Sequence, residues 1–332
     1  MTAPSSTWPI VSVIIPCFNA ERLIGDAIRS ALDQTYTNTE VIVIDDGSTD
    51  GSLDIIRSFG ERVRWETGPN RGGNAARNRG LEISNGQFVQ FLDADDKLLP
   101  SKITSGLRQL LRSDVDVCLV PFRIVHLDSH LTLSGFHELP AGDPLEWLLT
   151  ADLRMSPLYR SAILSTVRGF DPSLPCCQEF DLNLRIALHG ARYTCWGQIG
   201  YEVRRQPGSV SSDEIRLYRV MVKILNNIAN HLDPLDSRTD ARKKSLATRI
   251  AACGRWLLRF GDSQGGLEAF ATAFAVHESG GLKDAYSTLA LQLRRLMGPM
   301  LAERFLWRLR CLRNEGVNRL PRLPQQRAPL QR

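Results

Sequence analysis

Three aspartates stand directly after a short apolar segment, and their type and spacing are suited to holding a divalent metal. The segment Phe88–Leu92 is apolar apart from one glutamine, and it runs into Asp93, Ala94, Asp95 and Asp96. Side chains two residues apart in an extended segment point to the same side, so Asp93 and Asp95 can converge on one ion. Mg²⁺ and Mn²⁺ prefer carboxylate oxygens, with water and substrate phosphates at the remaining positions. We therefore predict a metal at Asp93 and Asp95, with Asp96 as a helper or a structural cap.

A simpler interpretation of these aspartates stays open, in which they solvate a strand end and cap a helix that starts near Pro100. A second acidic segment argues against it. The apolar run Val41–Ile44 also ends in paired carboxylates, Asp45 and Asp46. Ligands of open α/β sheets bind outside the carboxyl ends of the strands, so two acidic strand ends predict one shared crevice.

Elements of an alternating α/β fold surround the two acidic strand ends. A first strand over Val11–Ile15 is followed by apolar residues at helical spacing over 23–32. A further helix begins near Gly72, where glycine permits a tight turn, and it carries Arg77 and Arg79. These two arginines either face phosphate groups or lie on a solvated helix face.

Taken together, these segments resemble the family 2 glycosyltransferases of the GT-A fold. The motifs that carry the resemblance, in order and spacing, are Val11–Ala20, Val43–Asp50, Ala76–Asn78, Phe91–Asp96, Leu158–Arg160, Gly169–Asp171 and Gln178–Arg185. The similarity covers about residues 9–212. It implies an α/β fold with a Rossmann-like, mostly parallel sheet flanked by helices.

The resemblance also implies a nucleotide-sugar donor and a divalent metal, Mg²⁺ or Mn²⁺. The residues that it places around the base, ribose and diphosphate are Pro16, Phe18, Asp45, Asp46 and Arg77. Asp93 and Asp95 match the family's Asp-x-Asp, which binds the metal that bridges the donor diphosphate. A cation there stabilises the negative charge that builds on the leaving diphosphate.

An inverting transfer, which the resemblance implies, needs a base that removes the proton from the acceptor hydroxyl, and a carboxylate is suited to this role. This chain has Glu179 where the family usually has an aspartate. Glu179 is therefore the candidate base, and Asp181 is the alternative. The simpler interpretation, that both residues only cap the helix Leu182–Leu188, stays open.

A second departure from the family is Gln206, where many relatives have a histidine that supports the metal or the diphosphate. Glutamine is a poor metal ligand, so the metal would depend on Asp95 and phosphate. Arg204 or Arg205 would compensate by pairing with the diphosphate, or the two arginines would simply alternate along an edge strand.

The 332 residues are enough for two domains, and the net charge of +5 comes from a basic C-terminal part. The predicted divisions are an N-terminal extension over 1–8, a GT-A domain over 9–214, an α-helical C-terminal region over 215–318 and a disordered tail over 319–332. The helical region is predicted from apolar residues at helical spacing, among them Leu217, Leu246 and Phe270. Residues 254–276 faintly resemble a tetratricopeptide hairpin, a unit that needs neighbours for stability.

Residues 291–332 hold ten arginines and two glutamates, interleaved with large apolar side chains. The segment 291–318 suits peripheral contact with an anionic membrane surface, and a helix docked on the protein is the alternative. We expect no nucleic acid, because no recognition motif is present. No signal pattern or membrane-spanning apolar run is present either, which predicts a cytoplasmic protein with contact at the inner face of the membrane.

The predicted function is an inverting glycosyltransferase that moves a sugar from a nucleotide-diphosphate sugar, with UDP-sugars favoured, to a hydroxyl acceptor. The acceptor would be a glycan or a lipid-linked glycan in polysaccharide or glycolipid assembly. The alternative is a noncatalytic relative that binds a nucleotide or glycan within an assembly complex. A Rossmann-type oxidoreductase is disfavoured, because no Gly-x-Gly-x-x-Gly follows the first strand.

Overall fold

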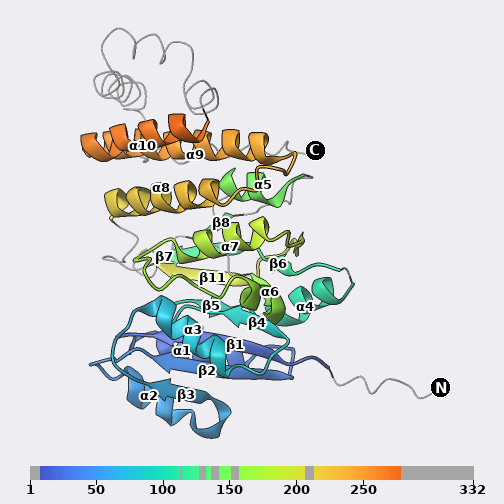
Figure 1. Cartoon of the computed structure of the whole chain (residues 1–332). Helices are drawn as coiled ribbons and strands as arrows, with labels where there is room; N and C mark the ends of the chain where they lie inside the picture. Colours follow the sequence, from blue (N-terminus) through green and yellow to red (C-terminus); the bar gives the residue numbers. More distant parts are fainter. Residues whose placement is uncertain are drawn as a thin grey trace, which may run out of the picture.

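The computed structural model describes residues 8–112, 114–126, 132–135, 142–150, 157–205 and 213–277, with the backbone alone at 132–135 and 150. Figure 1 shows an α/β part that contains the N-terminal half and a stack of helices on one side of it. The predictions for Gln206, for membrane contact through 291–318 and for the tail 319–332 lie outside the described residues. The N-terminal extension lies outside them up to residue 7.

A seven-stranded sheet forms the centre of the α/β part, in the order β10-β6-β9-β4-β1-β2-β3. Its strands are β1 (Val11–Cys17), β2 (Thr39–Asp45), β3 (Arg64–Thr67), β4 (Phe88–Phe91), β6 (Val117–Leu119), β9 (Leu158–Arg160) and β10 (Tyr193–Cys195). All neighbours are parallel except β9, which is antiparallel to both β4 and β6. The mostly parallel sheet is therefore confirmed.

The register of the inner strands brings their carboxyl ends to one edge of this sheet. Cys17 of β1 pairs with Asp45 of β2, and Ile14 pairs with Phe91 of β4. These strands are buried on both faces, which explains why they read as continuous apolar runs. The two acidic segments, after β2 and after β4, therefore lie at the same edge of the sheet, on either side of β1.

Helices and a second sheet surround the first sheet. The flanking helices are α1 (Ile24–Leu32), α2 (Ser52–Ser58), a 3₁₀ turn (Gly60–Arg62), α3 (Gly73–Ile83), α4 (Lys102–Arg112) and α6 (Ser161–Thr166). The second sheet has the order β5-β11-β7-β8, with β5 (Lys97–Leu98), β11 (Tyr201–Arg205), β7 (Phe122–His126) and β8 (Thr132–Gly135). Because β5 follows β4 after a short turn, this second sheet adjoins the loop that carries the three aspartates.

A second hydrophobic core holds the helical part together. It is built by α5 (Pro144–Thr150), α7 (Gln178–Leu188), α8 (Glu214–Asn230), α9 (Thr239–Arg259) and α10 (Ser263–Val276). The α-helical C-terminal region is thus confirmed as far as residue 276. Its core also includes Leu148 of α5 and Leu184 of α7, so the division at residue 214 stays a prediction. No helix within the described residues is both long and apolar enough to cross a bilayer.

Candidate functional site

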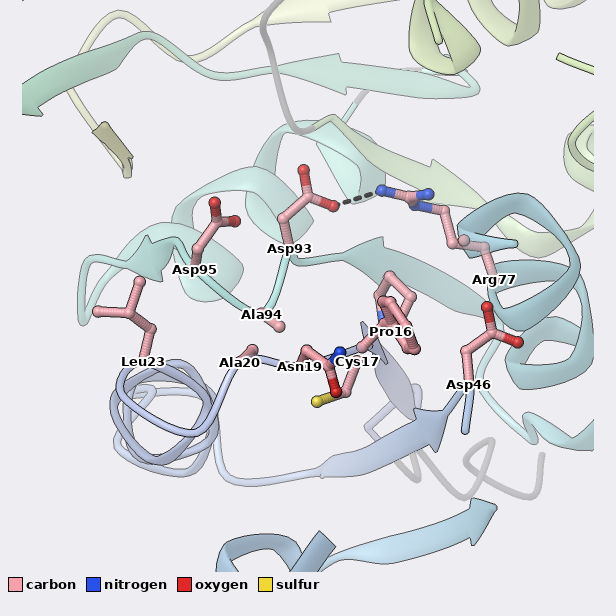
Figure 2. A pocket seen from close by; sticks show the side chains of 12 residues that line it. Pro16, Cys17, Asn19, Ala20, Leu23, Asp46, Arg77, Asp93, Ala94 and Asp95 are labelled. Atoms are coloured by element: carbon pink, nitrogen blue, oxygen red, sulfur yellow. Dashed lines mark hydrogen bonds and ion pairs between the residues drawn. The ribbon is translucent and has the colours of Figure 1, made fainter. Parts of the chain in front are cut away.

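A cavity of about 300 Å³ opens where β1 and β4 end. Figure 2 shows its lining side chains, which converge from the loops after β1, β2 and β4 and from the start of α3. The lining residues are Pro16, Cys17, Phe18, Asn19, Ala20, Leu23, Asp46, Gly73, Arg77, Asp93, Ala94 and Asp95. Six of the predicted site residues are among them, whereas Asp45, Glu179 and Asp181 are not.

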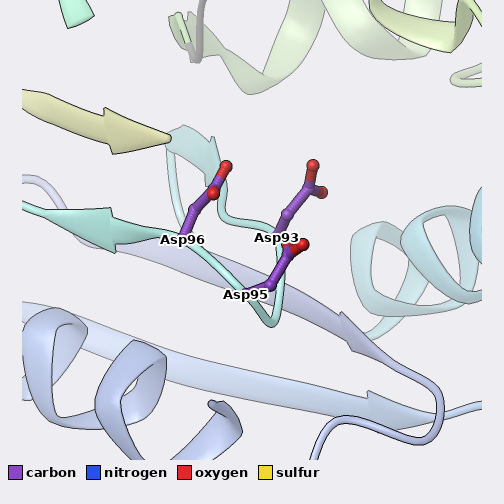
Figure 3. A group of neighbouring side chains, drawn as sticks. All are labelled: Asp93, Asp95 and Asp96. Atoms are coloured by element: carbon purple, nitrogen blue, oxygen red, sulfur yellow. The ribbon is translucent and has the colours of Figure 1, made fainter. Parts of the chain in front are cut away.

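The three aspartates after β4 form a cluster that fits a divalent cation. Asp93, Asp95 and Asp96 each place a carboxylate oxygen within 4.8 Å of the other two (Figure 3). Burial, and then the negative charge of Asp93, raise the pKa of Asp95 to about 6. Carboxylate oxygens are the ligands that Mg²⁺ and Mn²⁺ prefer.

The aspartates converge for a different reason from the one that strand alternation suggests. β4 ends at Phe91, and the backbone N–H of Asp96 donates to the carbonyl of Asp93 at 3.0 Å, which closes a turn. The turn, rather than an extended segment, brings Asp93 and Asp95 together. The two side chains do lie close together, but the extended geometry assumed for them was wrong, and the metal itself stays a prediction.

Asp96 is the structural member of the cluster. Its side chain is buried and accepts hydrogen bonds from the Tyr201 hydroxyl at 2.5 Å and from the Arg204 backbone N–H at 2.9 Å. Burial, together with the charges of Asp93 and Asp95, raises its pKa well above the ordinary value. Asp96 therefore ties the loop of residues 92–96, called the aspartate loop below, to β11. It is not a cap of α4, as the simpler interpretation held.

Arg204 holds the same loop from β11. Its guanidinium donates to the Asp95 carbonyl at 2.6 Å, to Asp26 at 2.9 Å and to the Leu23 carbonyl at 3.3 Å. The residue is 5% exposed, and β11 lies between β5 and β7. The expectation that Arg204 pairs with the diphosphate does not hold, because its guanidinium binds Asp26 and backbone carbonyls. The expectation of an edge strand does not hold either, because β11 is an inner strand.

Asp26 of α1 completes this support. It accepts from Lys97 at 2.8 Å, from Arg29 at 2.7 Å and from Arg204 at 2.9 Å. The hydrogen bonds from Lys97 and Arg29 hold its pKa well below the ordinary value. The sequence offered no sign of this role, because Asp26 and Arg204 are 178 positions apart.

Arg77 joins the aspartate loop to the candidate base. Its Nη2 lies 2.5 Å from Asp93 Oδ1 and 3.7 Å from Glu179 Oε1. The side chain is only 7% exposed and stands over the Phe170 ring, with 5.5 Å to the ring centre. Arg77 therefore faces the site, and its placement on a solvated helix face is wrong. That alternative fits Arg79, which is half-exposed and pairs with Glu66 and Glu82.

The second acidic strand end positions the helix that carries Arg77. Asp46 accepts from the backbone N–H groups of Arg71 and Gly72, both at 2.8 Å, just before α3 begins. Gly72 has a φ of 93°, a conformation that L side chains rarely adopt. Asp45 is buried and accepts from the Thr67 hydroxyl at 2.6 Å and the Ser48 N–H at 3.3 Å. Both aspartates thus shape the loops around the cavity.

The end of β1 and the loop after it form one wall of the cavity. Phe18 is 49% exposed and lines the wall beside Pro16. Asn19 has a φ of 49°, and its side-chain oxygen accepts from the Thr49 N–H at 2.8 Å. The loops after β1 and β2 therefore hold each other and present an uncovered aromatic ring.

Glu179 and Asp181 have different environments, although both lie in the first turn of α7. Glu179 is 28% exposed and faces Arg77. Burial raises its pKa; Arg77 opposes that shift, and Asp93 adds to it. The residue before the helix, Cys177, makes no side-chain capping bond.

Asp181 is 5% exposed and engaged elsewhere. Arg185 donates to its Oδ2 from Nε at 2.8 Å and from Nη2 at 2.6 Å, and also binds the Val167 carbonyl at 2.7 Å. This geometry fits a structural ion pair within α7, and the hydrogen bond from Arg185 to Val167 ties that helix to the end of α6.

Two asparagines of α3 were missed as site supports. Asn78 donates to the Phe170 carbonyl and accepts from the Phe170 N–H, both at 2.8 Å. Asn74 donates to the carbonyls of Asp171 at 2.8 Å and Leu174 at 3.1 Å. These hydrogen bonds fix the loop that leads into α7. The only indication in the sequence was that α3 and the stretch around Gly169–Asp171 both contain motifs of the family resemblance.

Comparison with known proteins agrees with this geometry. Residues 12–139 match the profile of Glycosyl transferase family 2. An uncharacterized glycosyltransferase of Haemophilus influenzae is 42% identical over 109 residues, which are 32% of this chain and 44% of that protein. A putative teichuronic acid biosynthesis glycosyltransferase of Bacillus subtilis is 40% identical over 169 residues, 49% of this chain and 61% of that protein. The matches thus span about half the length of these relatives.

Solved structures share the fold at low sequence identity. Staphylococcus aureus TarS 1–349 in complex with UDP-GlcNAc has a TM-score of 0.68 at 21% identity, with 93% of each chain covered. A mannosyltransferase from Pyrobaculum calidifontis in complex with GDP-Man and Mn²⁺ has a TM-score of 0.58 at 18% identity, covering 94% of this chain and 90% of the other. At these identities the likeness shows the fold.

Proposed function

Since the chain carries a Glycosyl transferase family 2 domain with the GT-A fold, we propose that it moves a sugar from a nucleotide-diphosphate sugar to a hydroxyl acceptor, with inversion at the anomeric carbon. One observation carries the proposal: the aspartate cluster and Glu179 flank a single buried cation, Arg77. A donor-binding centre and a candidate base therefore lie within the reach of one side chain.

The donor would bind along the cavity. Phe18 offers an exposed ring against which a base can stack, and Asp45 and Asp46 hold the loops on that side. Asp93 and Asp95 would hold Mg²⁺ or Mn²⁺. The bound cation would neutralise charge on the departing diphosphate. We favour a UDP-sugar, with support from the UDP-GlcNAc complex of TarS, whereas the mannosyltransferase was solved with GDP-Man.

Glu179 would take the proton of the acceptor hydroxyl. A carboxyl whose pKa burial raises is a better base than one with an ordinary pKa, because it binds the proton more strongly. Arg77 opposes the effect of burial on this pKa and so favours the charged form of Glu179. Asp181 stays the alternative, but its oxygen is already shared by two donors of Arg185.

The acceptor would be a glycan or lipid-linked glycan in the assembly of a polysaccharide or glycolipid. The relative named for teichuronic acid biosynthesis supports this class. We further propose that the protein acts in the cytoplasm, at the inner face of the membrane, where lipid-linked acceptors are presented. The basic segment 291–318 would supply that contact.

Turnover tests the proposal against a noncatalytic relative. Release of nucleoside diphosphate from UDP-sugars would be measured with and without Mn²⁺ and lipid-linked or soluble glycan acceptors, and the anomeric configuration of the product would be read by NMR. An acceptor-dependent product of inverted configuration is the expected result. Retained configuration would contradict inversion, and tight nucleotide binding without any product would favour the noncatalytic alternative.

A further inference from the structure

Two adjacent cysteines, Cys176 and Cys177, stand directly before α7, the helix that carries the candidate base Glu179. Both side chains are half-buried, and their sulfur atoms lie 3.8 Å apart, which is van der Waals contact. A further half-buried cysteine among the described residues, Cys195, stands on β10. The start of α7 therefore holds a pair of thiols that touch each other and that the proposed mechanism does not use.

Cys177 differs from its neighbour in backbone and in surroundings. Its φ of 62° and ψ of 26° are left-handed, a conformation that residues other than glycine seldom adopt. Its thiol donates to the Leu217 carbonyl of α8 at 3.8 Å and packs against the second hydrophobic core. Burial, and then the charge of Cys176, raise the pKa of Cys177, so this thiol stays protonated at neutral pH. Because the thiolate is the nucleophile, Cys177 suits the second step of disulfide formation rather than the first attack on an oxidant.

The backbone of Cys177 is also the start of the hydrogen bonding of α7. Its carbonyl accepts from the Asp181 N–H at 3.0 Å. Glu179 lies between these two residues in the chain, with its carboxylate 3.7 Å from Arg77. A shift of the Cys177 backbone would therefore move the side chain that the proposed function assigns as the base.

A disulfide between neighbours in the chain, a vicinal disulfide, cannot form without such a shift. Cα atoms across a trans peptide bond are about 3.8 Å apart, whereas residues joined by a disulfide usually have Cα atoms about 4.4–6.8 Å apart. The sulfur atoms must also approach from 3.8 Å to about 2.0 Å. Closing the ring therefore strains the peptide unit that joins Cys176 to Cys177, and the strained bond is readily reduced again.

We propose that Cys176 and Cys177 are a modification site, which hydrogen peroxide oxidises to a vicinal disulfide, and that this bond displaces the first turn of α7 with Glu179. The Cys176 thiolate attacks one peroxide oxygen, the O–O bond breaks, and the departing hydroxide takes up the proton that Cys176 lost, which gives water and a sulfenic acid. The Cys177 sulfur then attacks the Cys176 sulfur, the S–O bond breaks, and the departing hydroxide takes the Cys177 proton as a second water. The two sulfurs thus supply the two electrons that reduce one peroxide. A loss of turnover on oxidation rests on the proposed function, whereas the bond and the displacement do not.

Mass spectrometry of the full-length protein tests the bond itself. Trypsin releases both cysteines in one peptide, 169–185, which arginine cleavage sites flank and which holds no other cysteine. After treatment of the reduced protein with about one equivalent of hydrogen peroxide, this peptide should resist alkylation and be about 2 Da lighter, and dithiothreitol should reverse both changes. Cys176→Ser and Cys177→Ser should each abolish the loss of mass, and the matched control Cys195→Ser should keep it.

Two outcomes of this experiment overturn the proposal. Peptide 169–185 with both thiols alkylated after peroxide treatment would show that the pair does not close. A disulfide from either cysteine to Cys253 in the second core, or to a second copy of the chain, would show that the two neighbours are not each other's partners.

Hydrogen exchange of the oxidised protein tests the displacement without reference to activity. The amides at the start of α7, among them that of Asp181, should exchange at least about tenfold faster in the disulfide form, because the Cys177 carbonyl no longer holds its place. The amides of β1 should keep their protection, and peroxide should leave exchange in Cys176→Ser unchanged. Equal exchange at the start of α7 with and without the bond would overturn the displacement.

Turnover separates this inference from the proposed function. Oxidation should lower kcat by at least about tenfold, because misplacement of a catalytic group by about 1 Å is costly, and dithiothreitol should restore it. Cys176→Ser should turn over at the parent rate and resist peroxide. Full turnover of the disulfide form would overturn the link to Glu179. A reduced protein that is inactive, but still forms the bond and loosens α7, would support the thiol pair and contradict only the proposed function.

Discussion

Arg77 is the residue on which the geometry of the site depends. It is buried between two carboxylates, Asp93 on the aspartate loop and Glu179 on α7. A metal cation at the aspartates would share the Asp93 carboxylate with Arg77, whose Nη2 binds Oδ1. One guanidinium group thus lies close to both the proposed metal site and the candidate base.

Replacing the base should remove turnover and keep binding. We expect Glu179→Gln to lower kcat by about 10²–10⁴-fold, the usual contribution of a positioned general base, with nucleotide affinity changed little. Steady-state kinetics and calorimetric titration measure the two quantities. The comparison variant is Asp181→Asn, which should mainly lower stability because Arg185 loses its buried partner. A full rate in Glu179→Gln and a lost rate in a folded Asp181→Asn would reverse the assignment.

Metal affinity should depend on pH through the aspartate cluster. The pKa of Asp95 is raised to about 6 in the metal-free protein, and only the charged carboxylate binds metal. Affinity for Mn²⁺ should therefore be nearly constant above pH 7 and fall as pH drops through 6, by about tenfold per unit for one competing proton. Titrations between pH 5 and 8 measure this. Equal affinity at both ends would show that the cluster is not the metal site.

At the scale of elements, the site is held by links between segments far apart in the chain. Strand β11 reaches the aspartate loop and α1 through Arg204, and α3 reaches the loop before α7 through Asn78. These links use buried hydrogen bonds, so they have fixed geometry. Positioning of the aspartates therefore depends on α1 and β11 as much as on the strand that precedes them.

Removing Arg204 should loosen this support. We expect Arg204→Gln to lower the free energy of unfolding by about 3 kcal/mol, because Asp26 and two carbonyls lose a buried charged partner. Mn²⁺ affinity should fall as well, since the Asp95 backbone is no longer held. Arg79→Gln, on a half-exposed ion pair, is the control and should cost less than about 1 kcal/mol. Unchanged stability in Arg204→Gln would disprove the role assigned to β11.

The elements that position the site were readable in the sequence, and their long-range links were not. Apolar periodicity and acidic strand ends predicted β1, β2, β4, α1 and α3. This works because the spacing of apolar residues along a segment reflects which of its faces is buried. Periodicity gives no information on which loop a polar side chain reaches. Arg204 and Asp26 therefore looked like ordinary charged residues, and the turn that joins Asp93 to Asp96 was read as extended strand.

At the scale of the whole molecule, two hydrophobic cores share the helix that carries the candidate base. Phe180 and Leu184 of α7 pack in the second core, while Leu182 and Ile186 of the same helix pack in the first. The helical C-terminal part is thus coupled to the site through α7. We expect the two cores to unfold together.

A cavity in the second core should therefore affect the whole described molecule. Leu225→Ala, at a fully buried position of α8, should lower stability by about 2–5 kcal/mol and shift one common transition. Leu235→Ala, at a position 92% exposed, should stay within about 0.5 kcal/mol of the parent. Urea unfolding followed by circular dichroism and by tryptophan fluorescence measures both. Two separate transitions, only one of them shifted, would show that the cores are independent.

The central claim is that the aspartate cluster binds a nucleotide through a metal. Calorimetric titration with UDP, GDP and dTDP, each with and without Mn²⁺, tests it most directly, using the parent protein, Asp95→Asn and the exposed control Asp114→Asn. We predict that one nucleotide, UDP, binds only with Mn²⁺, that Asp95→Asn loses this binding and that Asp114→Asn keeps it. Binding that needs no metal and survives Asp95→Asn, or no binding of any nucleotide to the folded parent, would contradict the claim.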